Sequence, residues 1–106
     1  MRKITRDAVE AFVNGDNFKR DNTEVRTVNN ELLMYLHNNL IAYRCLGFDS
    51  VFINDAGWQT KTTKERLNGI LDAYHSDSLI YQKNYQWYLS RHGEVEEFPS
   101  NKWVSI

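Results

Sequence analysis

The chain has 106 residues, with 13 Lys and Arg against 14 Asp and Glu, which gives a formal net charge of −1. This length predicts a single domain over residues 1–106, and the near-neutral charge disfavours both strongly basic nucleic-acid binders and acidic DNA mimics. One cysteine excludes an internal disulfide and a Cys-rich zinc site, and neither a signal peptide nor an apolar run of the roughly 18 residues of a membrane span is expected.

The first half of the chain predicts one helix followed by strands. An apolar stripe at helical spacing predicts a helix from Thr5 to Asn14, with Thr5 as N-cap and Gly15 as the left-handed residue that ends it. The strands expected after it cover residues 23–28, 31–37, 40–45 and 50–54. Asn29-Asn30 and Asn38-Asn39 suit two-residue hairpin turns, because asparagine tolerates a positive φ.

The expected turn at Asn38-Asn39 decides which side chains share a face of the hairpin. With this turn, one face is wholly apolar and the other is mixed, and a slip of one residue would destroy the separation. The apolar face would carry Leu32, Met34, Leu36, Ile41, Tyr43 and Cys45. We therefore expect Tyr43 in the core together with Phe12, Tyr74 and Trp87, and Tyr35 on the mixed face.

The second half predicts a helix and another hairpin. Thr62 and Glu65 match a capping box ahead of an apolar stripe, and Gly69 within that helix indicates tight packing. A hairpin is expected over residues 78–82 and 85–90 with a turn at Lys83-Asn84, and residues 102–106 favour a last strand. The connections are too short for parallel crossovers, so we expect an α+β fold: an antiparallel sheet of about five or six strands packed against two helices.

The sequence carries no pattern typical of catalysis. The three histidines lie far apart and have no ligand spacing, so no metal is expected. No carboxylate pair is spaced for acid–base work, and no glycine-rich loop precedes a helix to hold a phosphate. We therefore expect neither an enzyme nor a cofactor.

The segment from Gly57 to Lys64 is the most unusual part of the sequence. It places one tryptophan, three threonines and two lysines at the start of the second helix. Two interpretations stay open: helix capping with a tryptophan that fills the helix–sheet junction, or a contact with an anion, a nucleotide or nucleic acid. Aromatic residues on mixed strand faces add further candidate contacts. The residues expected to bind a partner are Trp58, Lys61, Lys64, Tyr35, Tyr81 and Tyr88.

Several short segments resemble a family of small tailed-bacteriophage accessory proteins with the pattern NTEV…YLHGNLIA…NAGW…TTKERLN…WYL. The matching segments are residues 22–25, 35–42, 54–58, 62–68, 81–82 and 87–89. The chain departs from this pattern where Asn38-Asn39 replaces a turn that contains glycine. The resemblance implies a phage protein; small phage proteins without catalytic motifs often bind a host protein, and inhibitors of host defence such as anti-CRISPR proteins are a prominent class.

Three hypotheses for function follow. The first is a protein of the host cytoplasm that binds a host protein or defence complex stoichiometrically. The second, from another class, is a module that binds a nucleotide or single-stranded nucleic acid, with an affinity that falls steeply with salt. The third is a homodimer with a structural role in the virion.

Overall fold

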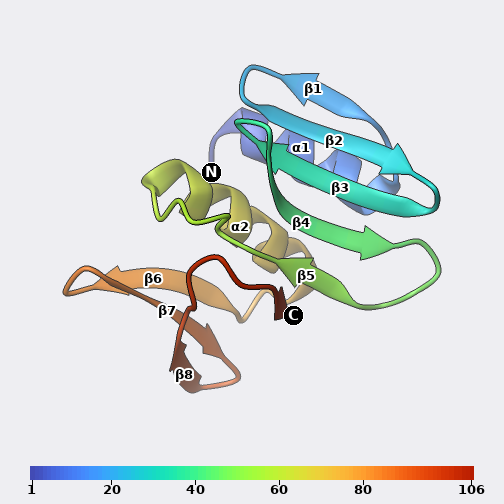
Figure 1. The fold of residues 1–106 in the computed structure, drawn as a ribbon. Coiled ribbons are helices and arrows are strands. Elements are labelled where there is room, and N and C mark those ends of the chain that lie inside the picture. The colour runs from blue at the N-terminus through green and yellow to red at the C-terminus, as the bar shows by residue number, and fades with distance from the viewer.

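The computed structural model describes residues 1–106 and contains two helices and nine strands (Figure 1). The helices are α1 (Lys3–Asn14) and α2 (Lys61–Tyr74). The strands are β1 (Phe18–Arg20), β2 (Thr23–Val28), β3 (Glu31–Leu36), β4 (Asn39–Cys45), β5 (Val51–Ile53), β6 (Leu79–Lys83), β7 (Gln86–Arg91), β8 (Glu94–Glu97) and β9 (Val104–Ser105).

The strands form two antiparallel sheets. The larger sheet has six strands in the order β1-β2-β3-β4-β5-β9, and the smaller has three in the order β6-β7-β8. The α+β prediction is confirmed. The sequence did not predict that the second hairpin would form a sheet of its own, and it missed β1 and β8, whose residues are mostly charged and exposed.

One hydrophobic core joins the two sheets through the helices. Helix α1 packs on β1, β2 and β3, whereas α2 packs on α1 and β6 (Figure 1). The core is one cluster of buried residues that includes Phe12 of α1, Leu32 of β3, Ile70 of α2 and Trp87 of β7. The expected burial of Phe12 and Trp87 is confirmed, and Tyr74 is partly buried with its ring edge against Phe12.

The start of α1 differs from the prediction. Arg2 occupies the N-cap position and makes no side-chain cap, so the expected cap at Thr5 is wrong. Thr5 lies inside the helix and is fully buried. Its hydroxyl bonds with Glu65 and accepts a hydrogen bond of 2.7 Å from Arg66 Nη1, so the side chain is occupied away from the helix start. The end of α1 is as predicted: Gly15 has a φ of 83° and donates its N–H to the Ala11 carbonyl.

Arg66 of α2 connects three elements from a fully buried position. Besides Thr5 of α1, its guanidinium donates to Thr23 Oγ1 of β2 at 3.0 Å and pairs with Glu65 at 3.1 Å. Burial lowers the pKa of Arg66, but an arginine remains protonated at any ordinary pH. A buried charge that is fully bonded in this way fixes how the two helices and β2 sit on one another.

Helix α2 begins two residues earlier than the predicted capping box. Thr60 is the N-cap, and its Oγ1 accepts a hydrogen bond of 3.1 Å from the Thr63 N–H, so the expected cap at Thr62 is wrong. Glu65 does not reach back to a cap, because its carboxylate bonds with Thr5 and Arg66.

The hairpin turns follow the predicted chemistry, but two of them lie one residue away from the predicted position. Asn29 and Asn30 both have a positive φ, as expected for a type I′ turn. The next turn uses His37-Asn38 instead of Asn38-Asn39, and the turn of the smaller sheet uses Asn84-Tyr85 instead of Lys83-Asn84.

A β-bulge in the β3–β4 pair changes the faces of β4. The register shifts between Met34 and Tyr35, which leaves Ile41 as the extra residue and buries both Ile41 and Ala42. Beyond the bulge, Tyr43 and Cys45 point away from the helices, so their expected positions on the apolar face are wrong. The inward position goes to Arg44, whose guanidinium donates to the carbonyls of Phe12 and Val13 at the end of α1.

Candidate protein-binding face

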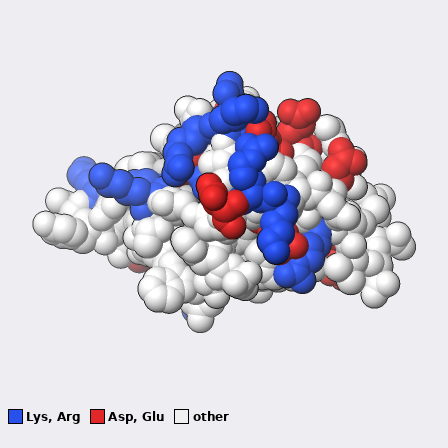
Figure 2. Space-filling model, turned by 90° about the horizontal axis from the view of Figure 1, so that it is seen from above, with Lys and Arg blue, Asp and Glu red and all other residues white.

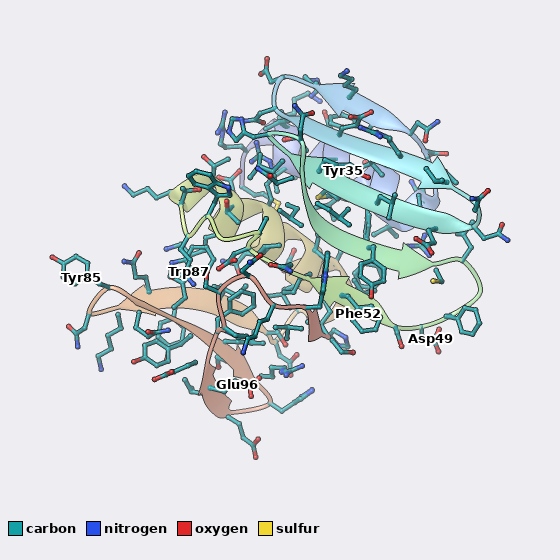
Figure 3. All side chains as sticks on the ribbon, in the orientation of Figure 1. Tyr35, Asp49, Phe52, Tyr85, Trp87 and Glu96 are labelled. Atoms are coloured by element: carbon teal, nitrogen blue, oxygen red, sulfur yellow. The ribbon has the colours of Figure 1, made fainter.

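No helix covers the outer face of the six-stranded sheet, and aromatic residues collect there (Figures 1 and 3). Residues that face one another across the strands form two rows on this face. The first row is Lys19, Glu24, Tyr35 and Leu40; the second is Arg26, Leu33, Tyr43, Phe52 and Ser105. We call Tyr35, Tyr43, Phe52 and the adjoining Trp103 the aromatic face.

The rings of this face stand upright on the sheet. Tyr43 and Phe52 are stacked with ring centroids 4.9 Å apart and planes 15° apart. This separation equals the spacing of roughly 4.8 Å between neighbouring strands, so the stacking axis lies in the plane of the sheet. Trp103 meets Tyr43 edge-on, with centroids 4.8 Å apart and planes at 78°. Tyr43 and Phe52 therefore present their ring edges to solvent.

Arg26 covers the remaining ring. Its guanidinium carbon lies 4.5 Å from the centroid of Tyr35, within cation–π range. The same guanidinium pairs with Glu24, with Nε 3.0 Å from Oε2. This pairing lowers the pKa of Glu24 and raises that of Arg26. Arg26 is thus held in one place at the border of the aromatic face.

A second feature is a cavity of about 530 Å³ at the start of α2. Its apolar walls come from Leu36, Ile41, Ala56 and Trp58, and its polar walls from His37, Asn39, Asp55, Thr60, Thr62 and Thr63. Trp58 is 60% exposed, so it does not fill the helix–sheet junction as one interpretation of the sequence held.

Asp55 stabilises the turn that carries Trp58. It is fully buried, and Oδ1 accepts hydrogen bonds of 2.7 Å from the backbone N–H groups of Gly57 and Asn101. Oδ2 accepts from the Gln59 amide at 3.1 Å. Asp55 therefore ties this turn to the segment that leads into β9.

The residues predicted to bind a partner lie in three separate places. Trp58, Lys61 and Lys64 lie at the start of α2, with Trp58 and Lys61 exposed and Lys64 half-buried. Tyr35 lies on the aromatic face. Tyr81 and Tyr88 stack on each other at 5.6 Å on the outer face of the smaller sheet. The structure does not bring these six residues together into one site.

Sequence reasoning missed most of the aromatic face. Tyr43 was expected in the core because the bulge in β4 leaves no signal in the alternation of apolar residues. Phe52 lies on the face of β5 opposite to the buried Val51 and Ile53, and nothing in the sequence placed it beside Tyr43. Trp103 comes from the tail, and only the pairing of β9 with β5 brings it to this face.

The structure contains no group of three or more His, Cys, Asp or Glu side chains that could hold a metal ion. Cys45 is a free, half-buried thiol on the outer side of β4. Neither helix, at 12 and 14 residues, has the length and apolar character needed to cross a membrane.

Comparison with known protein families matches the sequence of this chain to a phage family. Residues 1–105 match the family model described as Kyanoviridae Gp96 protein. The chain belongs to the Kyanoviridae Gp96 protein family. The resemblance to a tailed-phage accessory family is thereby confirmed. No curated protein and no solved structure gives a significant match.

Proposed function

We propose that this Gp96 family protein acts in the host cytoplasm by binding a host protein stoichiometrically, through the aromatic face and without catalysis. The uncovered aromatic face is the observation that carries the proposal. Tyrosine, tryptophan and arginine are the residues that most often dominate binding energy at protein interfaces, and on this face Arg26 lies on Tyr35 while Trp103 meets Tyr43. Within this proposal, inhibition of a host defence complex is the role to test first.

The ring geometry favours a protein partner over single-stranded nucleic acid. Proteins that bind single strands stack successive bases on open ring faces. On the aromatic face, one face of Tyr43 stacks on one face of Phe52 and Arg26 lies over one face of Tyr35, so three of the four rings each have a face already occupied. The half-buried rings of Tyr35, Tyr43 and Phe52 and the exposed indole of Trp103 suit packing against apolar side chains of a protein.

Affinity capture from infected cells tests the proposal. The tagged wild-type chain is expected to retain a host protein in a fixed molar ratio, measured by native mass spectrometry. Phe52→Ala removes the ring that stacks on Tyr43. If Phe52 is a hot spot worth at least about 2 kcal/mol, this variant weakens binding about 30-fold or more.

Tyr81→Ala is the matched control, because it breaks an aromatic pair on the smaller sheet and leaves the aromatic face intact. Circular dichroism and urea unfolding establish that both variants are folded. Capture that survives Phe52→Ala but is lost with Tyr81→Ala would place the interface on the smaller sheet and refute the proposal. Failure of the wild-type chain to retain any host protein would refute it as well.

A further inference from the structure

A band of basic side chains runs from the border of the aromatic face around the β1 edge to α1. Figure 2 shows Lys and Arg as a blue band over this side of the molecule, with acidic side chains among and beside them. Four of its members are defined by their contacts: Lys3, Lys19, Arg20 and Arg26. We call these four residues the basic band. The band is a local feature, because the whole chain has a net charge of −1.

At the α1 end of the band, two cations share one carboxylate oxygen. Lys3 Nζ lies 2.9 Å from Asp7 Oδ2, and Arg20 Nη1 lies 2.8 Å from the same oxygen. These two hydrogen bonds lower the pKa of Asp7. One negative charge against two positive charges leaves this set with a surplus of positive charge.

At the sheet end of the band, Glu24 also has two cations as neighbours. Arg26 pairs with Glu24 on β2, and Lys19 of β1 lies directly opposite Glu24 on the same face. This set also carries a surplus of positive charge. Because Arg26 also lies on the ring of Tyr35, this surplus is fixed at the border of the aromatic face.

We propose that the protein partner presents a cluster of Asp or Glu carboxylates to the basic band, beside the apolar residues that cover the aromatic face. This inference rests on the proposed function and specifies the chemistry of the partner. The surplus charge of the two sets is complementary to carboxylates, and charge complementarity at the rim of an interface speeds association and selects partners. A nucleic acid would also match the charge, but Tyr35, Tyr43 and Phe52 each already have one ring face occupied by a neighbouring side chain, which favours a protein.

Zero-length carbodiimide cross-linking of the complex retained from infected cells tests the inference, because this reagent joins lysine amines only to carboxyl groups in direct contact. We expect links from Lys3 or Lys19 to Asp or Glu residues of the host protein. We also expect Arg26→Glu to slow association about 10-fold or more at low salt and to flatten its salt dependence. Arg26→Gln is the milder variant if the reversal of charge disturbs β2.

Lys83→Glu is the matched control, since Lys83 lies at the end of β6 on the smaller sheet and outside the band. If Phe52→Ala abolishes capture while Arg26→Gln and Arg26→Glu bind normally, the carboxylate inference is wrong and the proposed function stands. Cross-links only from Lys61, Lys64 or Lys83 also overturn it. An oligothymidine that displaces the host protein at physiological salt would identify a nucleic acid as the occupant of the band. If no host protein is retained, the proposed function fails and the inference fails with it.

Discussion

Replacing Gly69 with alanine is expected to destabilise the protein, against the usual effect of this change in a helix. In an exposed helix, Gly→Ala adds about 1 kcal/mol of stability. At Gly69 a Cβ would lie 2.7 Å from Thr5 Cγ2 and 3.0 Å from Val9 Cγ2 of α1. Carbon atoms prefer separations of about 3.5–4.0 Å, so the new methyl group would lie too close to both atoms, by roughly 0.5–1.3 Å.

Thr5 has little freedom to move away, because its hydroxyl is bonded to Glu65 and Arg66. Extra groups in a packed core cost about 1–3 kcal/mol, and we place this site in the upper half of that range. Subtracting the helix gain leaves a net loss of about 1–2 kcal/mol, or a melting temperature lower by at least about 4 °C.

Urea unfolding followed by circular dichroism measures this difference. Asp72→Ala on the same helix is the control, because Asp72 is exposed and the change adds helix propensity without a clash. We expect the Asp72 variant to be at least as stable as wild type. A Gly69→Ala variant that gained about 1 kcal/mol would show that α1 and α2 do not approach as closely as described.

Three further predictions concern polar groups. Arg66→Met leaves the buried hydroxyl oxygens of Thr5 and Thr23 without the donor they have in the wild type and should reduce the free energy of unfolding by about 3 kcal/mol, measured by urea titration; an unchanged midpoint would contradict the buried network. Asp55→Ala should cost about 2 kcal/mol and speed hydrogen exchange at the Asn101 amide, which loses its acceptor; equal exchange rates would remove Asp55 as the tie between the two segments. The lowered pKa values of Asp7 and Glu24 mean that both carboxylates stabilise the fold at neutral pH and lose this effect as the pH falls below about 4. An Asp7→Asn/Glu24→Gln variant should therefore show a shallower loss of stability in acid titrations, and an identical acid profile would count against the pairing.

Local sequence patterns were sufficient to predict the α+β class and most elements, but not the exact position of each turn. The asparagines indicated the hairpins correctly, because they adopt a positive φ. Which two residues form the turn depends on burial in the two strands. At the β3–β4 turn, the consecutive burial of Ile41 and Ala42 requires a bulge, and the turn moves to His37-Asn38.

The candidate site was harder to predict, because it depends on long-range pairing. Tyr43 looks like a core residue in any regular hairpin with the predicted turn, and only the bulge turns it outward. Trp103 reaches the aromatic face because β9 pairs with β5, across about half the chain. Conversely, Trp58, which the sequence predicted to bind a partner, lies at a cavity away from the aromatic rows.

Hydroxyl-radical footprinting of the captured complex tests the central claim most directly, because it reports solvent access to individual aromatic side chains. If the aromatic face binds the partner, oxidation of Tyr43, Phe52 and Trp103 falls in the complex. Tyr85, which is 94% exposed at the hairpin tip of the smaller sheet, should be oxidised at the same rate in both states. Protection of Tyr85 or Trp58, with no change at Tyr43, Phe52 and Trp103, would contradict the account.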